Sequence, residues 1–230
     1  MAPAKLYYFK GRGRSQQSRW VLAASSIAFT NVCLSTSAEF QALCDSGKLA
    51  YNQVPMLEAD GGRCISQSMA IVRHAARAGN LYGTCAEEAA RIDEVLDGIS
   101  DARGAIVGYP FMDPREACAR LQQSVQKFFP CFERIVEGNG APPFAVGASL
   151  TAADVLLAEL VDSTSEAFSA TFEPAMADSV LQPFPRLRAL HAHVLALPQI
   201  QAFRTGPNWM AFPEGQVGRD YVTNVRTVLA

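Results

Sequence analysis

A short aromatic segment near the start of the chain, residues 5–10 (KLYYFK), carries a tyrosine that could act on an anion. The phenol of Tyr8 has a reference pKa of about 10, so it keeps its proton at neutral pH and can donate a hydrogen bond. Arg14 follows closely, and a fixed cation near the same anion would favour the charged form, although a surface arginine is the alternative. A strand position alone suggests another role, a packing aromatic, and Tyr7 would face the opposite side of the strand.

A serine before an apolar helical pattern is the second chemical feature. Ser68 precedes Ile71, Val72 and Ala75, which fall on one helix face. The N-terminus of a helix, with a serine cap, attracts a carboxylate. The alternative is a purely structural N-cap, and both roles can hold together.

The elements that must position these residues follow from the pattern of the first 80 or so residues. Gly11 and Gly13 end the first strand and either permit close backbone approach or simply form the turn. Asp60-Gly61-Gly62 is a hairpin signal. The order β-α-β-loop-β-β-α implies a small sheet with parallel and antiparallel strands and helices packed on it. The predicted strands are 5–10, 31–34, 54–59 and 63–65, and the predicted helices are 18–27 and 68–78.

From residue 86 onward the chain predicts helices with short connections, because apolar residues recur at helical spacing. Thr151 and Asp154 form a capping-box start before the apolar run VLLAELV. We assign that aspartate to the folding of a buried helix, not to a site. Two domains follow: an α/β domain over residues 1–83 and an all-helical domain over residues 84–230.

Composition excludes several functions. The 230 residues are 49% apolar, which is ample for a large core, and the net charge is −2. No basic run could neutralise a phosphate backbone, so we expect no nucleic-acid partner. No apolar run reaches the roughly 18 residues of a membrane span, and residues 1–14 lack the apolar core of a secretory signal. We therefore expect a cytoplasmic protein with no membrane partner.

The six cysteines form no CxxC pair and do not cluster with the three histidines. We expect reduced, mostly buried thiols and no metal site. The turn after the first strand reads GRGRSQQS, and the absence of cysteine there excludes disulfide exchange at this position. His74, His191 and His193 lie in helical patterns and are interpreted as satisfied surface or core residues.

Several segments together resemble one known family. The opening KLYYFKGRGRSQQSRWVLAA, then NQVPMLEADGG, ISQSMAIVRHAA and NLYG, and later KFFPCFERIVEG and FAVGASLTAADVLLAEL, are similar in order to cytosolic glutathione transferases of the tyrosine type. The likeness is to alpha-like members, with the sigma, mu and pi classes as near relatives. It implies a thioredoxin-like domain, an all-helical domain, a homodimer, and conjugation of glutathione, as co-substrate, to electrophiles.

The resemblance implies roles for residues of the first domain. Tyr8 stands where the family's catalytic tyrosine falls, and Arg14 matches an arginine near the sulfur. Gln53-Val54-Pro55 resembles the segment with a cis-proline, whose cis bond turns the Val54 backbone toward the glutathione peptide, although a trans turn is the ordinary alternative. Gln67-Ser68 resembles the dipeptide that takes the γ-glutamyl end.

Other implied residues lie near the subunit interface or the glycine end of glutathione. Asp101 and Lys127 resemble residues that reach the ligand from the partner subunit, and Tyr51 resembles an aromatic key inserted into that subunit. Solvated helix-face charges are the alternative for the first two. The family usually places a basic residue before the QVP segment. Here Cys44 stands at that position, and Lys48 is the candidate substitute.

The chemistry fits these residue types in magnitude. A free thiol has a pKa of about 8.5, so roughly 3% is thiolate at pH 7, and the thiolate is the nucleophile. Lowering that pKa by about two units requires roughly 2.7 kcal/mol. A hydrogen bond to a charged group supplies about 1.5–3 kcal/mol, so one hydroxyl helped by a cation suffices. Ser15 is the alternative hydroxyl, because other transferase classes use a serine at the helix start.

The second substrate should bind between the domains in a mostly apolar pocket. Isomerase or peroxidase activity with glutathione, of a sigma-like type, is an alternative to conjugation, and a non-catalytic ligand-binding protein is another. The candidate pocket residues are Phe9, Gly13, Pro110, Phe111, Met112, Trp209, Met210 and Phe212, and most could equally be ordinary core.

Overall fold

The N-terminal part of the chain is built on a four-stranded sheet. The computed structural model describes residues 3–172 and 179–230. The strands lie in the order β2-β1-β3-β4, with β1 parallel to β2 and the other neighbours antiparallel. The predicted small mixed sheet is confirmed. The bounds are β1 Ala4–Phe9, β2 Phe29–Leu34, β3 Met56–Glu58 and β4 Cys64–Ser66.

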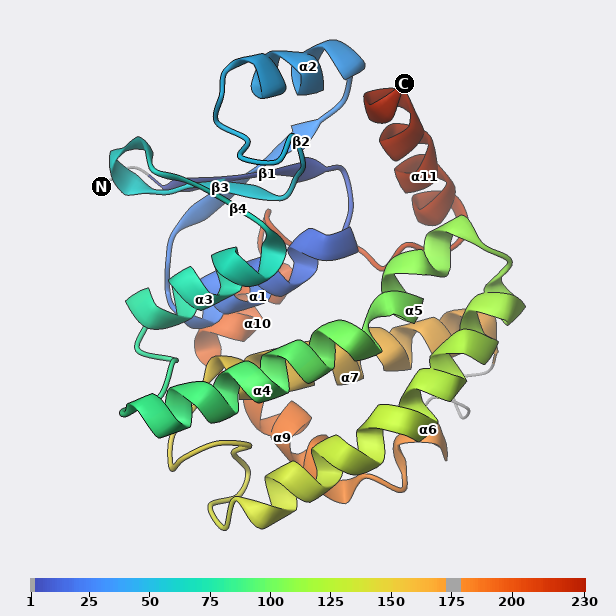
Figure 1. The fold of residues 1–230 in the computed structure, drawn as a ribbon. Coiled ribbons are helices and arrows are strands. Elements are labelled where there is room, and N and C mark those ends of the chain that lie inside the picture. Colours follow the sequence, from blue (N-terminus) through green and yellow to red (C-terminus); the bar gives the residue numbers. More distant parts are fainter. Residues whose placement is uncertain (1–2, 173–178) are drawn as a thin grey trace.

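Helices lie on both sides of this sheet. α1 and α3 pack together between the sheet and the helical domain, whereas α2 lies beyond the other side of the sheet (Figure 1). In the parallel ladder Tyr8 lies opposite Cys33, near the end of β1 that leads into the first helical turn. The bounds are η1 Gly13–Ser15, α1 Gln16–Ala24, α2 Ser37–Asp45, η2 Asp60–Gly62 and α3 Ser68–Ala78.

The helix α2 replaces the loop that the sequence pattern predicted between the second and third strands, so that prediction was wrong. The Thr36 hydroxyl accepts a hydrogen bond from the Glu39 N–H at 3.2 Å, and the Glu39 carboxylate accepts one from the Thr36 N–H at 3.2 Å. This is a capping box. α2 contains no buried residue, so its apolar periodicity is weak and the cap is its main sequence signal.

The C-terminal domain surrounds one buried helix, α7. The amide and hydroxyl of Thr151 donate to the Asp154 carboxylate over 2.7 and 2.8 Å, which confirms the predicted helix start. α4, α6 and α9 pack around α7 (Figure 1). The bounds are α4 Ala86–Ala102, α5 Gly104–Gly108, η3 Tyr109–Phe111, α6 Pro114–Gly138, α7 Ala152–Thr171, α9 Pro185–Leu195, α10 Pro198–Thr205 and α11 Gly215–Leu229.

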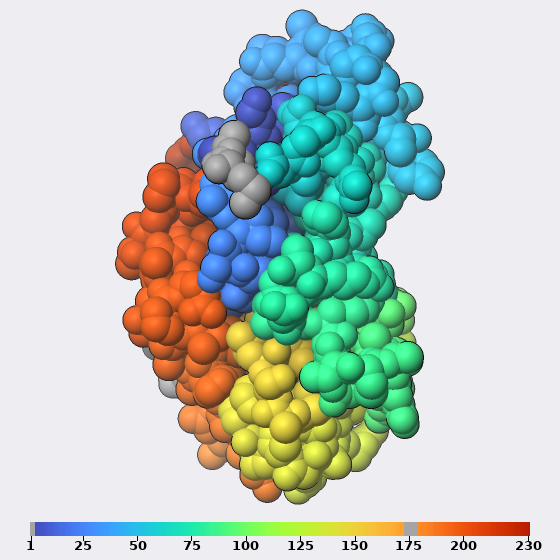
Figure 2. All heavy atoms as spheres, turned by 90° about the vertical axis from the view of Figure 1, so that its left-hand side faces the viewer, coloured from blue at the N-terminus to red at the C-terminus, as the bar shows by residue number. Residues whose placement is uncertain are grey.

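The last part of the chain returns to the first domain. The Asn208 side chain donates to the Phe29 carbonyl at 2.7 Å and accepts from the Asn31 N–H at 3.2 Å. Figure 2 shows this C-terminal segment, in orange, against the blue N-terminal segments. One cluster of buried apolar side chains runs from Leu6 and Trp20 in the first domain into α7. The two domains therefore share a core.

The architecture is a thioredoxin-like α/β domain followed by an all-helical domain, as predicted. Within residues 3–172 and 179–230, no helix is both long enough and apolar enough to cross a bilayer.

Candidate active site

Tyr8 lies near the end of β1, beside the loop that leads into α1. Its side chain is 5% exposed, and its hydroxyl oxygen accepts a hydrogen bond from the Arg14 backbone N–H at 2.9 Å. A phenol hydroxyl can accept and donate hydrogen bonds at the same time. The bond from Arg14 therefore leaves the Tyr8 proton available. The residue also lines an open cavity, toward which that proton can be offered.

Tyr7 is on the other face of the strand, as alternation requires. Its hydroxyl donates to the Glu58 carboxylate at 2.8 Å. Burial, followed by the hydrogen bond to Glu58, raises the pKa of Tyr7. Tyr7 is thus a satisfied residue at the β1–β3 pairing, and the two adjacent tyrosines have separate environments.

The cavity has a volume of about 670 Å³, within the usual range of small-molecule sites. It brings together many of the residues that the sequence predicted for glutathione binding, although these are distributed over 60 or so residues of chain. Phe40, Asn52 and Leu229 were not predicted and add to its wall. The lining residues are Tyr8, Phe9, Arg14, Phe40, Asn52, Gln53, Val54, Pro55, Gln67, Ser68 and Leu229.

The backbone at the cavity has two special features. The Val54–Pro55 peptide bond is cis, which confirms the expectation drawn from the resemblance. Gln67 has φ 75°, in the left-handed region, and it is the N-cap of α3. Such a conformation costs of order 1–3 kcal/mol and is typically retained at ligand sites. Ser68 is the first helical residue, so its predicted N-cap role was wrong, and no side-chain hydrogen bond caps α3.

Gly13 is required where the loop passes the tyrosine hydroxyl. It has φ 37°, and a Cβ on this residue would collide with the hydroxyl oxygens of Tyr8 and Tyr221. A Cβ on Gly11 would likewise collide with the Tyr221 ring. The glycines therefore serve close approach and not only the turn.

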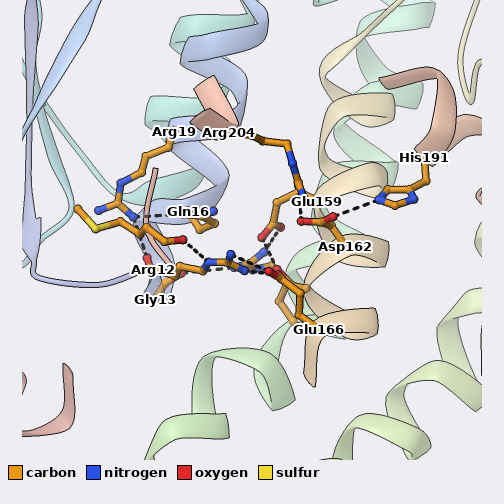
Figure 3. A network of polar contacts seen from close by, with 12 residues as sticks. Arg12, Gly13, Gln16, Arg19, Glu159, Asp162, Glu166, His191 and Arg204 are labelled. Carbon is orange, nitrogen blue, oxygen red and sulfur yellow. Dashed lines mark hydrogen bonds and ion pairs between the residues drawn. The ribbon is translucent and has the colours of Figure 1, made fainter. Parts of the chain in front are cut away.

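One ion pair joins this loop to α7 (Figure 3), and a second ion pair connects the loop to α7 indirectly through Arg103. Arg12 pairs with Glu166, and one of its guanidinium nitrogens lies 3.0 Å from Glu166 Oε1. Arg103, at the end of α4, pairs with Glu159 and donates to the Gly13 carbonyl at 3.3 Å. Arg12, Arg103 and Glu159 are at most 4% exposed. The buried charges hold the Gly13 backbone in place beneath Tyr8.

Arg14 differs from its neighbours in the same loop. It is exposed and lines the cavity, whereas Arg12 is buried. Its side chain forms no hydrogen bond or ion pair with the residues that the structure describes. A guanidinium at a cavity wall without a protein partner is available for an anionic ligand.

Tyr221, on α11, was missed by the sequence analysis. It is 4% exposed and packs in one apolar cluster with Tyr8, Phe9 and Leu34. Its ring lies edge-on to Phe111, with 5.8 Å between centroids. No local sequence pattern could connect it to Tyr8, because the two residues lie at opposite ends of the chain.

Other predicted residues lie outside the cavity wall. The Lys48 ammonium lies 2.8 Å from Glu58 Oε1. Asp101 and Lys127 are exposed on α4 and α6, and the Lys127 ammonium lies 4.6 Å from the Phe128 ring centroid. Tyr51 is 65% exposed. One chain alone therefore does not bring these four residues to the cavity.

The expected electrophile pocket is mostly packed in this structure. Phe212 is 6% exposed and its ring contacts Tyr109, with 5.1 Å between centroids. The Met210 carbonyl accepts from Arg12 at 2.7 Å, and the Arg12 guanidinium lies 4.7 Å from the Trp209 ring. Phe111 is 44% exposed beside Tyr221. Pro110 and Gly13 adjoin a small cavity of about 10 Å³, and the Met112 side chain lies close to Gly108.

The alternative hydroxyl, Ser15, is fully buried and donates to the Arg12 carbonyl at 3.2 Å. It does not line the cavity. Tyr8 is therefore the better-placed hydroxyl donor.

A thioredoxin-like domain with a cis-proline before β3, joined to an all-helical domain, is the architecture of the glutathione transferases. Residues 4–77 match the glutathione S-transferase N-terminal domain family, and residues 100–206 match the C-terminal domain family. The chain belongs to the glutathione S-transferase family.

Individual relatives agree with this assignment. Glutathione S-transferase alpha-4 of Rattus norvegicus is 36% identical over 98% of this chain and 97% of its own length. Glutathione S-transferase A4 of Mus musculus is 35% identical over 99% and 98%. The solved structure of NaGST-2 superimposes with a TM-score of 0.74 at 28% identity and covers 90% of this chain and 98% of its own.

Proposed function

We propose that this protein is a glutathione transferase in which the Tyr8 hydroxyl stabilises the glutathione thiolate for attack on hydrophobic electrophiles. The observation that carries the proposal is the hydrogen bond from the Arg14 N–H to the Tyr8 oxygen, which leaves the phenol proton facing a cavity of suitable size. A tyrosine hydroxyl is a hydrogen-bond donor, so Tyr8 can donate to the sulfur and stabilise its charged form.

The cavity wall supports an orientation for glutathione. The γ-glutamyl end lies at Gln67 and Ser68, where the first amides of α3 favour a carboxylate. The peptide backbone lies along Val54 and Pro55, and Arg14 adds positive charge near the sulfur. Gln53 and Lys48 are the proposed contacts of the glycine end, for which Lys48 must leave Glu58.

The electrophile binds on the apolar side of the sulfur. Phe9 already lines the cavity there, with Phe40 and Leu229. Phe111 is the exposed aromatic nearest to α11 among the predicted residues. Access to the more deeply packed members of the proposed pocket requires displacement of side chains around Tyr221. These members are Gly13, Pro110, Met112, Met210 and Phe212.

We also propose a homodimer that works in the cytoplasm. Asp101 and Lys127 lie on exposed faces of α4 and α6, so they reach glutathione only across a subunit interface that includes those helices. An exposed Tyr51 suits insertion into such an interface, and a cavity between α4 and α6, lined by Val95 and Ile135, offers a place for it. All six cysteines are free, consistent with a reducing compartment, although only Cys118 is buried and the expectation of mostly buried thiols was wrong.

The test is Tyr8→Phe, with Tyr7→Phe as its matched control. Loss of a hydrogen bond to a charged group costs about 1.5–3 kcal/mol, so the turnover of an aromatic chloride should fall about tenfold to about a hundredfold. The pKa of enzyme-bound glutathione, followed by thiolate absorbance, should rise toward that of the free thiol. Tyr7→Phe should leave both measurements unchanged.

Three results would redirect the proposal. Near-normal turnover in Tyr8→Phe would point to Ser15. Higher rates with an isomerisable ketone or an organic hydroperoxide than with the aromatic chloride would favour a glutathione-dependent isomerase or peroxidase. Failure to bind immobilised glutathione would favour a non-catalytic protein.

A further inference from the structure

Tyr221 places a second hydroxyl beside that of Tyr8. Both hydroxyl oxygens lie so close above Gly13 that a Cβ there would collide with both. The Tyr221 ring covers Gly11 and meets Phe111 edge-on, so the whole side chain is packed and 4% exposed. A buried tyrosine hydroxyl usually finds a hydrogen-bond partner, and the Tyr8 hydroxyl lies next to it.

The helix that carries Tyr221 is held against the ends of two strands. The Asn224 side chain accepts a hydrogen bond from the Lys10 N–H at 2.7 Å and donates one to the Leu34 carbonyl at 2.9 Å. Val228, one turn further, is fully buried in the cluster with Tyr8 and Phe9. Tyr221 is therefore located by α11 docking and not by a free terminal segment.

The other hydrogen bonds of the two tyrosines and the pKa of Tyr221 indicate which hydroxyl is the donor. The Tyr8 oxygen already acts as an acceptor, because the Arg14 N–H donates to it. Burial first, then the charge and hydrogen bond of Tyr8, raise the pKa of Tyr221, so Tyr221 holds its proton firmly. The buried Arg19 of α1 interacts electrostatically with both tyrosines, and it offsets the rise of the Tyr221 pKa only in part. A hydroxyl that keeps its proton beside an oxygen that acts as an acceptor is the donor of the pair.

We propose that Tyr221 is a positioning residue, whose hydroxyl donates to the Tyr8 oxygen and so directs the Tyr8 proton at the glutathione sulfur. This role rests on the proposed function of Tyr8. With the Arg14 N–H and the Tyr221 hydroxyl both donating to the Tyr8 oxygen, the Tyr8 O–H is directed toward the cavity. Donation into the phenol oxygen also polarises its O–H, which strengthens the bond that Tyr8 makes to the thiolate. No proton is transferred between the tyrosines.

The test is Tyr221→Phe, which removes the hydroxyl but keeps the ring on Gly11 and Phe111. The titration midpoint of enzyme-bound glutathione should rise by about 0.5 unit, and kcat/KM for an aromatic chloride below that midpoint should fall about threefold, because 0.5 unit is a threefold change in thiolate. The KM for glutathione should stay the same, and the thermal unfolding midpoint should fall by no more than about 2–4 °C, the effect of losing one buried hydrogen bond. Tyr7→Phe, which removes a tyrosine hydroxyl bonded to Glu58, is the control and should not shift the thiol.

Two further variants separate positioning from packing. In the Tyr8→Phe background, Tyr221→Phe should have no additional effect, because Tyr221 acts through the missing hydroxyl. Asn224→Ala should raise the thiol midpoint in the same direction, since α11 is less firmly docked. An unchanged or lowered midpoint in Tyr221→Phe, or an additive effect in the double variant, would overturn the role. A wild-type protein whose bound thiol titrates like free glutathione would instead remove the proposed function itself.

Discussion

The two sides of the loop formed by residues 11–14 use arginine in opposite ways. On the side toward α7, Arg12 is buried and paired with Glu166, and Arg103 pairs with Glu159 below the Gly13 carbonyl. On the cavity side, Arg14 is exposed and has no partner among the described residues. A buried guanidinium needs a carboxylate partner, whereas a guanidinium exposed at a cavity wall is available to bind an anionic ligand. The ion pairs on the α7 side thus fix the loop backbone, and the unpaired arginine on the cavity side is available to bind a ligand.

The largest effect is expected when the buried ion pair between Arg103 and Glu159 is broken. Glu159→Gln leaves Arg103 buried without a counter-charge, which should lower the free energy of unfolding by about 3–5 kcal/mol. Urea denaturation measures this change. Glu94→Gln is the matched control, because Glu94 pairs with Arg91 on an exposed surface, and the loss should be below about 1 kcal/mol. Equal losses of stability in the two variants would mean that the buried ion pair contributes no more to stability than an exposed one.

The next largest effect is expected at Gly13, the glycine of the loop that lies between the α7 side and the cavity side. Gly13→Ala forces a side chain into a left-handed backbone position and against two hydroxyls, so it should cost about 1–3 kcal/mol of stability and also reduce turnover. Thermal unfolding and initial rates would measure both. Gly104→Ala, in a helix with open space around its Cβ position, should be neutral or slightly stabilising. If Gly13→Ala were as stable and active as wild type, the close packing at this glycine would have no consequence.

The smallest effect on stability is expected for Arg14, on the cavity side of the loop, where a substitution should mainly lower the catalytic rate. Arg14→Gln removes the charge that we propose stabilises the thiolate, so kcat/KM should fall about tenfold, equivalent to about 1.4 kcal/mol. The free energy of unfolding should change by less than about 0.5 kcal/mol, since no described residue depends on that side chain. If Arg14→Gln lost stability but kept its rate, Arg14 would have a structural role like that of Arg12, and the proposed difference between the two arginines would be wrong.

The sequence was sufficient for the features that depend on local pattern or on the family resemblance. The strands, the hairpin near Asp60 and the capping box at Thr151 follow from short-range signals, and the structure has them. The cavity residues Tyr8, Val54 and Ser68 were predicted through motifs resembling the family, and they lie in one cavity wall. Their separate catalytic roles remain predictions.

What the sequence could not provide depends on contacts between distant residues or on weak periodicity. α2 was missed because it buries no residue, although its Thr36–Glu39 cap was readable. Tyr221 reaches Tyr8 from the other end of the chain, which no spacing rule describes. The run GRGR does not reveal that Arg12 is buried and Arg14 exposed, because the carboxylate that decides this lies on α7.

The shared core has a consequence for how this kind of protein can be recombined. The loop beneath the tyrosine is held by carboxylates of α7, and Trp20 of α1 packs against Phe203 and Trp209. A thioredoxin-like module grafted onto a foreign helical module would lose these counter-charges and this aromatic contact together. Chimaeras and swapped segments therefore need matched acidic residues on the receiving helix before the cavity can be expected to keep its shape.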